Sequence, residues 1–176
     1  MSDLLRGSTL YGIAEVDNDL IMASSGGMLV YNRVSNKYVP INYPPDYRPG
    51  SIRFRSLKRE GPQSWWIGSD KGIFLLTSGK GEYKISRPPQ LKGMDIFTTG
   101  SFRKYLKKGD DYYFALSNAG FLHWNQRTRQ YTHYRHITGE EASLGDDNLN
   151  QVEFDREGNI LIGHNEGLSV YSPDRK

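Results

Sequence analysis

Short apolar runs recur along the chain with similar polar turns between them. Four segments read alike around Gly27, Gly72, Gly120 and Gly167, with one apolar run before each glycine and another after it. These glycines are 45, 48 and 47 residues apart. A period in the forties built from short apolar runs, without the 3.6-residue spacing of helices, is typical of β-propeller blades. The pattern predicts an all-β array in which each glycine forms a hairpin turn.

Each copy divides into four short runs, which predicts blades of four antiparallel strands. The first runs are 10–16, 52–57, 102–106 and 152–154, and a turn rich in polar residues or glycine follows each of them. The fourth run carries a tyrosine eleven residues after the glycine, namely Tyr38, Tyr83 and Tyr131. The equivalent position of the last copy is 178, beyond Lys176. We therefore expect about 3.75 blades in a single array over 1–176, at 8–46, 51–86, 100–137 and, incomplete, 149–176.

The strand count favours an open fragment of a larger propeller. Closed propellers have about 4 to 8 blades, and residues 1–9 contain no aromatic residue that would match the three tyrosines. A closed ring of four blades is the alternative. An open fragment leaves an apolar face at each end, and such faces tend to find a partner. We therefore expect self-association, or contact with the remaining blades of a parent protein.

Composition narrows the partners of the chain. Hydrophobic residues make up 36% and charged residues 24%, as in soluble globular proteins. The net charge of +3 comes from 23 basic and 20 acidic residues, a mixture that predicts no nucleic-acid partner. No apolar run approaches the roughly 20 residues that span a bilayer, so we expect no membrane contact by this segment. The absence of cysteine excludes disulfides and thiol chemistry.

The histidines and paired acids are the candidates for metal binding or catalysis. His133 and His136 are three residues apart on a predicted strand, so their side chains point to opposite faces. No cysteine or nearby carboxylate completes a four-ligand site, and we expect neither metal nor cofactor. Glycoside hydrolysis needs two carboxyl groups at a set separation. The adjacent pairs 110–111, 140–141 and 146–147 are more typical of solvated turns.

Aromatic residues and rim loops are the candidates for ligand binding. Trp66 falls in phase with the apolar positions of the other copies and is assigned to packing, whereas Trp65 points the opposite way and stays a candidate for stacking on a sugar. In propellers, the loops between strands two and three and those between blades share one rim. A ligand on that rim would contact Asp46, Tyr47, Arg48, Asp70, Lys71, Asn118, His164, Asn165 and Glu166.

Two segments resemble the two-component regulator propeller repeat. Its blades run from a valine-containing strand through Asp-x-x-Gly and a Leu-Trp-Ile-Gly-Thr-like strand to Gly-Leu-x-x-Tyr. The segment 148–171 follows this order, and Trp66-Ile-Gly-Ser-Asp-Lys-Gly-Ile73 is similar to its centre. The first and third copies depart from it, because Met22-Ala23 and Phe114-Ala115 replace Trp-Ile-Gly.

The resemblance implies a function that composition and spacing do not. Proteins with these repeats are typically extracytoplasmic sensor regions of bacterial hybrid two-component systems, often responding to breakdown products of complex glycans. It implies a non-catalytic sensory module with an oligosaccharide ligand, periplasmic or otherwise extracytoplasmic, with any kinase elsewhere in the parent chain. A propeller-fold polysaccharide lyase or glycoside hydrolase is one alternative, and a propeller that serves as a scaffold for proteins is another.

Overall fold

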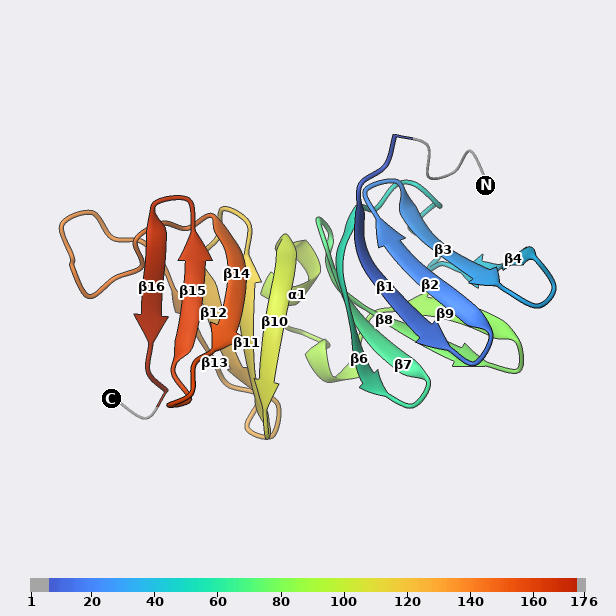
Figure 1. Ribbon diagram of the computed structural model, residues 1–176. Helices are drawn as coiled ribbons and strands as arrows, with labels where there is room; N and C mark the ends of the chain where they lie inside the picture. Colours follow the sequence, from blue (N-terminus) through green and yellow to red (C-terminus); the bar gives the residue numbers. More distant parts are fainter. Residues whose placement is uncertain (1–6, 174–176) are drawn as a thin grey trace. The chain divides into compact units, whose positions relative to one another are not determined.

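The structure, a computed structural model, describes residues 7–173 and divides into two compact units, Met1–Thr99 and Gly100–Lys176. Each unit contains two blade-like sheets of short strands (Figure 1). Within residues 7–173 the helical segments are a 3₁₀ turn, Pro89–Leu91, and the four-residue α1 (Ile96–Thr99). The predicted all-β class built of propeller blades is confirmed. Whether the blades form one open array stays a prediction.

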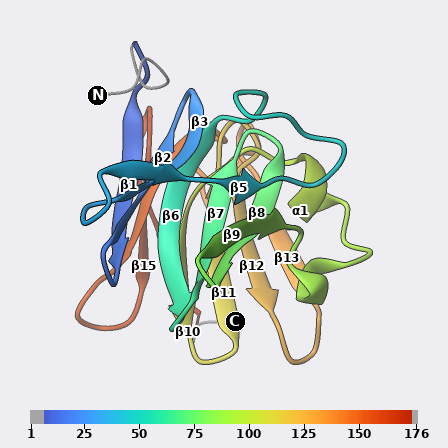
Figure 2. The same cartoon turned by 90° about the vertical axis from the view of Figure 1, so that its right-hand side faces the viewer.

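The first unit holds one four-stranded and one five-stranded sheet. The first sheet has the order β1 (Leu10–Val16), β2 (Asp19–Ser24), β3 (Gly27–Asn32) and β4 (Lys37–Val39). The second consists of β6 (Phe54–Gly61), β7 (Ser64–Ser69), β8 (Gly72–Gly79) and β9 (Glu82–Ser86). The short strand β5 (Ile41–Asn42) pairs in parallel with β9 at its edge (Figure 2). The repeat pattern does not predict β5, which lies within the range 8–46 expected for the first blade but pairs in the second sheet.

The second unit repeats the pattern with one sheet shorter. Its first sheet is β10 (Phe102–Lys108), β11 (Asp111–Leu116), β12 (Phe121–Asn125) and β13 (Tyr131–Tyr134). Its second sheet has three described strands, β14 (Leu149–Phe154), β15 (Ile160–His164) and β16 (Gly167–Tyr171). The tyrosines of the first three copies lie on β4, β9 and β13, as the repeat predicts.

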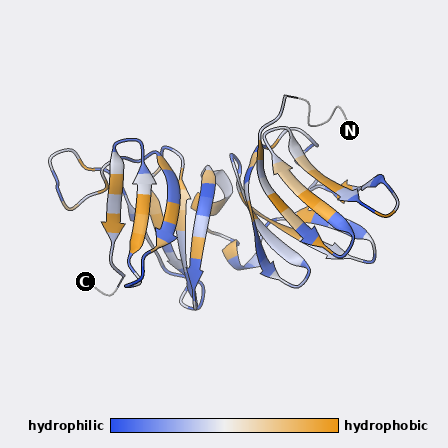
Figure 3. Ribbon diagram, viewed as in Figure 1, coloured by the Kyte–Doolittle hydropathy of each residue, from blue (hydrophilic) through white to orange (hydrophobic). Residues whose placement is uncertain are grey.

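The core of the first unit lies between its two sheets. Trp65 is completely buried there, in one cluster with Phe54, Phe74 and Ile21. The hypothesis that Trp65 stacks on a sugar is therefore wrong. The strands β7 and β11 read as continuous apolar runs because they are buried at nearly every position, on both faces. Figure 3 shows hydrophobic residues along the strands of both units.

The four repeat glycines lie at the hairpin turns, as predicted. Gly27, Gly72, Gly120 and Gly167 have φ values of 124°, 90°, 80° and 131°, a region that side chains disfavour. At two of them, the segment that runs from the fourth strand to the next sheet also passes directly over the turn. A Cβ atom would overlap the carbonyl oxygen of Phe97 at Gly72, and that of Tyr134 at Gly120.

Candidate ligand-binding site

A pocket recurs at the same place in the first three sheets. Each pocket is lined by the residue that follows the repeat glycine, and by the segment that leaves the fourth strand. The volumes are about 350 Å³ beside Met28, 280 Å³ beside Ile73 and 310 Å³ beside Phe121. The pocket in the second unit combines aromatic, polar and charged side chains, and is the candidate site; we call it the Tyr171 pocket.

The Tyr171 pocket is lined by both apolar and polar side chains. Buried Phe121, Leu144 and Ile162 line it together with the rings of Tyr134 and Tyr171. These two rings are 5.0 Å apart between centroids and meet at 57°. The hydrogen-bonding side chains that line it are His133, Tyr134, Arg135, Glu140, Ser143, Ser169 and Tyr171. Such a combination suits a ligand with both apolar faces and hydroxyl groups.

One wall of the pocket is the loop 135–147, which Asp147 fastens. Its Oδ2 accepts hydrogen bonds from Nε and Nη2 of Arg135 at 2.8 and 2.7 Å. Its Oδ1 accepts one from the backbone N–H of His136 at 2.7 Å. Burial acts to raise the pKa of Asp147, but the bonds from Arg135 and His136 outweigh it, and the pKa lies below its ordinary value. The charged carboxylate therefore holds both ends of the loop together.

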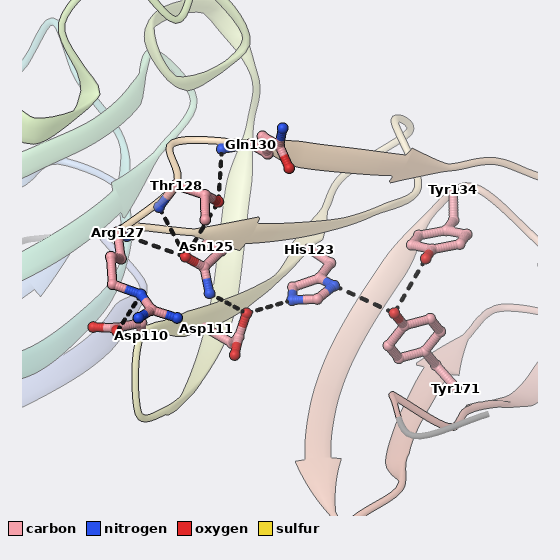
Figure 4. Close-up of polar contacts among 9 residues, drawn as sticks. All are labelled: Asp110, Asp111, His123, Asn125, Arg127, Thr128, Gln130, Tyr134 and Tyr171. Carbon is pink, nitrogen blue, oxygen red and sulfur yellow. Dashed lines mark hydrogen bonds and ion pairs between the residues drawn. The ribbon is translucent and has the colours of Figure 1, made fainter. Parts of the chain in front are cut away.

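A hydrogen-bonded series of four side chains holds the Tyr134 and Tyr171 rings of the pocket in place (Figure 4). The Tyr134 hydroxyl donates to that of Tyr171 over 3.1 Å, and the Tyr171 oxygen lies 3.3 Å from Nδ1 of His123. His123 Nε2 lies 2.8 Å from Oδ1 of Asp111. Since Tyr134 already donates to Tyr171, the Tyr171 proton is free to bond Nδ1, which places the imidazole proton on Nε2, facing Asp111.

The pKa values of Tyr171 and Asp111 are shifted in opposite directions in this hydrogen-bonded series. Burial raises the pKa of Tyr171, and the hydrogen bond with Tyr134 raises it further. Burial also acts to raise the pKa of Asp111, but bonds from Asn125 and His123 outweigh it, so this pKa is lowered. At neutral pH Asp111 is therefore an anion and Tyr171 a neutral phenol. The hydrogen-bonded series therefore orients the rings of Tyr134 and Tyr171, and it supplies no phenolate base.

The first unit contains a similar group of hydrogen bonds where its two sheets meet, which we call a junction. Its presence there indicates that the series from Asp111 to Tyr134 has a structural role. Asp19 on β2 accepts hydrogen bonds from Asn32 on β3 at 2.6 Å and from the Tyr83 hydroxyl at 2.8 Å. Tyr83 belongs to the other sheet of that unit, as Tyr171 does in the second unit. In the second unit Asp111 accepts from Asn125 at 2.9 Å, and His123 is inserted before the tyrosine.

The sequence itself contains a signal for this junction. Asn32 and Asn125 are each followed three residues later by a hydroxyl residue, Ser35 or Thr128. In both cases the asparagine Oδ1 accepts from the backbone N–H and the hydroxyl of that residue, as Figure 4 shows for Thr128. The repeated pattern of aspartate, asparagine and Ser or Thr would have marked the junction in copies one and three.

The structure divides the nine predicted rim residues between the two units. Five lie in the first unit and four in the second: Asp46, Tyr47, Arg48, Asp70 and Lys71, and then Asn118, His164, Asn165 and Glu166. Among them His164 lies next to the Tyr171 pocket. Its Nε2 is 3.0 Å from Oγ of Ser169, and its ring occupies the space above Gly145, where a Cβ atom would otherwise be.

Several other rim residues have local structural partners. Asp70 accepts a hydrogen bond from the backbone N–H of Arg53 at 3.0 Å, and Asn165 accepts from Asn150 Nδ2 at 3.0 Å. The Arg48 carbonyl accepts from Ser51 within a turn, and Asn118 has a φ of 59° in the hairpin after β11. A ligand-binding role for the nine stays a prediction. Tyr134, Ser169 and Tyr171 of the candidate pocket are not among the nine, because they lie on strands and not in rim loops.

His133 and His136 make hydrogen bonds to the backbone. His133 Nε2 contacts the Ala119 carbonyl oxygen, and His136 Nδ1 lies 2.7 Å from that of Leu144. Across residues 7–173 there is no group of three His, Cys, Asp or Glu residues placed to hold a metal ion.

The fold is that of known β-propellers. No protein-family model matches the chain, and no curated protein matches it in sequence. The extracellular domain of the putative hybrid two-component system BT3049 from B. thetaiotaomicron is similar with a TM-score of 0.67 and 14% identity, over 94% of this chain and 22% of that one. That of BT4673 from the same organism, a putative hybrid two-component system, gives 0.67 and 21%, over 92% and 21%.

A third similar structure is the WD40 β-propeller domain of Doa1, with a TM-score of 0.61 and 12% identity, over 95% of this chain and 52% of that domain. The chain spans about a fifth of the length of the two extracellular domains. At these identities the likeness establishes the fold. In residues 7–173, no helix is long and apolar enough to cross a membrane.

Proposed function

We propose that this chain is a non-catalytic ligand-binding part of an extracytoplasmic sensor in a bacterial two-component system, of the two-component regulator propeller type. The likeness to two extracellular domains of such systems supports the class of protein. The Tyr171 pocket is the observation that carries the binding function, because it joins aromatic faces to hydroxyl and charged groups. A short oligosaccharide derived from a glycan has the matching chemistry.

The test is titration of short neutral and acidic oligosaccharides by calorimetry, with product analysis of the same mixtures. Ala142 lines the pocket and is exposed, so Ala142→Trp will fill the mouth and weaken binding at least about tenfold, or 1.4 kcal/mol. Glu141→Trp is the matched control, because Glu141 is exposed and lies outside the lining. Equal binding by the two variants would remove this pocket as the site.

An enzyme is the second candidate, and the hydrogen-bonded series of Asp111, His123 and Tyr171 is the observation in its favour. The raised pKa of Tyr171 and the analogous junction in the first unit argue against it. Cleavage of an oligosaccharide, abolished by Tyr171→Phe, would establish the enzyme and overturn the sensor.

We also propose that the chain self-associates or joins further blades through β16. Within residues 7–173 no strand pairs with its outer edge. Leu168 and Val170 on one face of β16 have exposed fractions of 61% and 59%, and such apolar surface favours association.

We expect light scattering to show a dimer or larger species that Leu168→Lys shifts to monomer. Val34→Lys, at a 72% exposed position in a turn, will leave the assembly unchanged. A monomeric wild type at high concentration contradicts self-association through β16.

A further inference from the structure

The second sheet of the first unit contains a pocket with a charged group that the proposed function does not use. The pocket has a volume of about 280 Å³ and is lined by Arg87, Pro88 and Leu91, by Lys92, and by Ile73 and Phe97. We propose that it binds the carboxylate of a small organic acid, with Arg87 as the group that holds the anion. It shares no lining residue with the Tyr171 pocket.

The charge of Arg87 is not neutralised by the protein. Its Nη1 donates to the Ile73 carbonyl oxygen at 3.0 Å, and its Nη2 to the Tyr47 hydroxyl at 2.7 Å and the Thr98 carbonyl oxygen at 3.3 Å. All three acceptors are neutral. In the part of the chain that the structure describes, no carboxylate forms an ion pair with Arg87. A partly buried cation without a counter-charge attracts an anion strongly, because the surrounding dielectric is low.

The guanidinium is also held in a fixed orientation. Its central carbon lies 3.9 Å from the centroid of the Phe74 ring and 5.5 Å from that of Tyr47. These contacts and the three hydrogen bonds restrict the side chain before any ligand arrives. Arginine has five N–H donors, so donors remain for a ligand oxygen. A restricted guanidinium loses little conformational entropy on binding, which favours affinity.

The rest of the pocket defines the ligand class. Ile73, Pro88, Leu91 and Phe97 are buried and apolar. The volume of about 280 Å³ lies just below the roughly 300–1,000 Å³ of sites for drug-sized molecules, so the ligand is small. Arg87 is the cation held in place at the pocket, whereas Lys92 is exposed, so one negative charge suits the site better than a phosphate dianion, which requires more fixed donors and charge. These features select a compact monocarboxylate with an apolar body, such as an aromatic or short aliphatic acid.

Benzoate is a suitable probe, with benzamide as its neutral counterpart of equal shape. In amide NMR titrations of the full chain we expect benzoate to shift the signals of Leu91, Phe97 and Thr98, and to bind at least about tenfold more tightly than benzamide and than inorganic phosphate. Equal affinity for benzamide overturns the proposal, because binding would then be apolar. Preference for phosphate, or shifts confined to other residues, overturns it too.

Two variants test the role of the charge. Arg87→Gln will reduce benzoate affinity at least about tenfold while leaving benzamide affinity unchanged. Because Arg87 also packs on Phe74 and Tyr47, this variant can lose stability, and Lys92→Glu provides an independent test. Lys92 is exposed at the pocket, and a carboxylate there will repel benzoate and weaken its binding several-fold. Unchanged benzoate affinity in Lys92→Glu and in folded Arg87→Gln overturns the proposal.

Discussion

Gly120→Ala is expected to lower the free energy of unfolding of the second unit by about 3–5 kcal/mol, from backbone strain and overpacking together. The strain arises because Gly120 has a φ of 80°. The overpacking arises because a Cβ atom would overlap the Tyr134 carbonyl oxygen and lie 3.1 Å from Oδ1 of Asp147. The carbonyl is part of the backbone, so it cannot turn aside as a side chain would. Since domains are stable by only about 5–15 kcal/mol, the loss removes a large share of the total.

Gly167→Ala is the matched control for that substitution. Gly167 begins β16 and has a φ of 131°, but a Cβ atom there would have no neighbour within 4 Å. We expect only the conformational cost, about 1–3 kcal/mol. Denaturant titration followed by hydrogen exchange of peptides from residues 100–176 reports on this unit alone. If the two variants lose the same stability, the passage of the connecting segment over Gly120 contributes nothing.

The repeat glycines illustrate what a sequence can predict about this fold. A positive φ is a local property, so a glycine between two apolar runs indicates a hairpin wherever it occurs. The overlap at Gly120 depends instead on Tyr134, fourteen residues later, and follows only from the route of the connecting segment. For the same reason β5 was missed, because it is two residues long and three strands, β6, β7 and β8, separate it from its partner β9.

The nine predicted rim residues and the Tyr171 pocket come from different elements, and a binding role for either stays a prediction. The rim was assigned to loops by analogy with other propellers, and His164 does contact Ser169 beside the Tyr171 pocket. The pocket itself is also lined by β13 and β16, through Tyr134 and Tyr171. Repeat spacing assigns a residue to a strand, but it does not show which strand end remains uncovered where two sheets meet.

Asp147→Ala will destabilise the second unit by about 2–4 kcal/mol, since hydrogen bonds to charged groups contribute roughly 1.5–3 each and are not additive. The substitution removes the bonds to Arg135 and to the backbone of His136, so the loop 135–147 loses its fastening. Oligosaccharide binding in the Tyr171 pocket is expected to weaken in parallel. Asp110→Ala is the control, because Asp110 pairs with Arg127 at 3.6 Å on the surface, where such a pair contributes less than about 1 kcal/mol.

The pH dependence separates the charge of Asp147 from its shape. Its pKa is lowered in the folded protein, so its contribution to stability is complete above the unfolded pKa of 3.8 and is lost as the pH falls through the folded pKa. Asp147→Asn has no such titration. As the pH falls below 3.8 and through the lower folded pKa, wild type will therefore lose more stability than Asp147→Asn. Asp111 and Asp155 also have lowered pKa values, but they titrate in both proteins and cancel in the difference. Parallel acid profiles would show that the Asp147 carboxylate gains nothing from its charge.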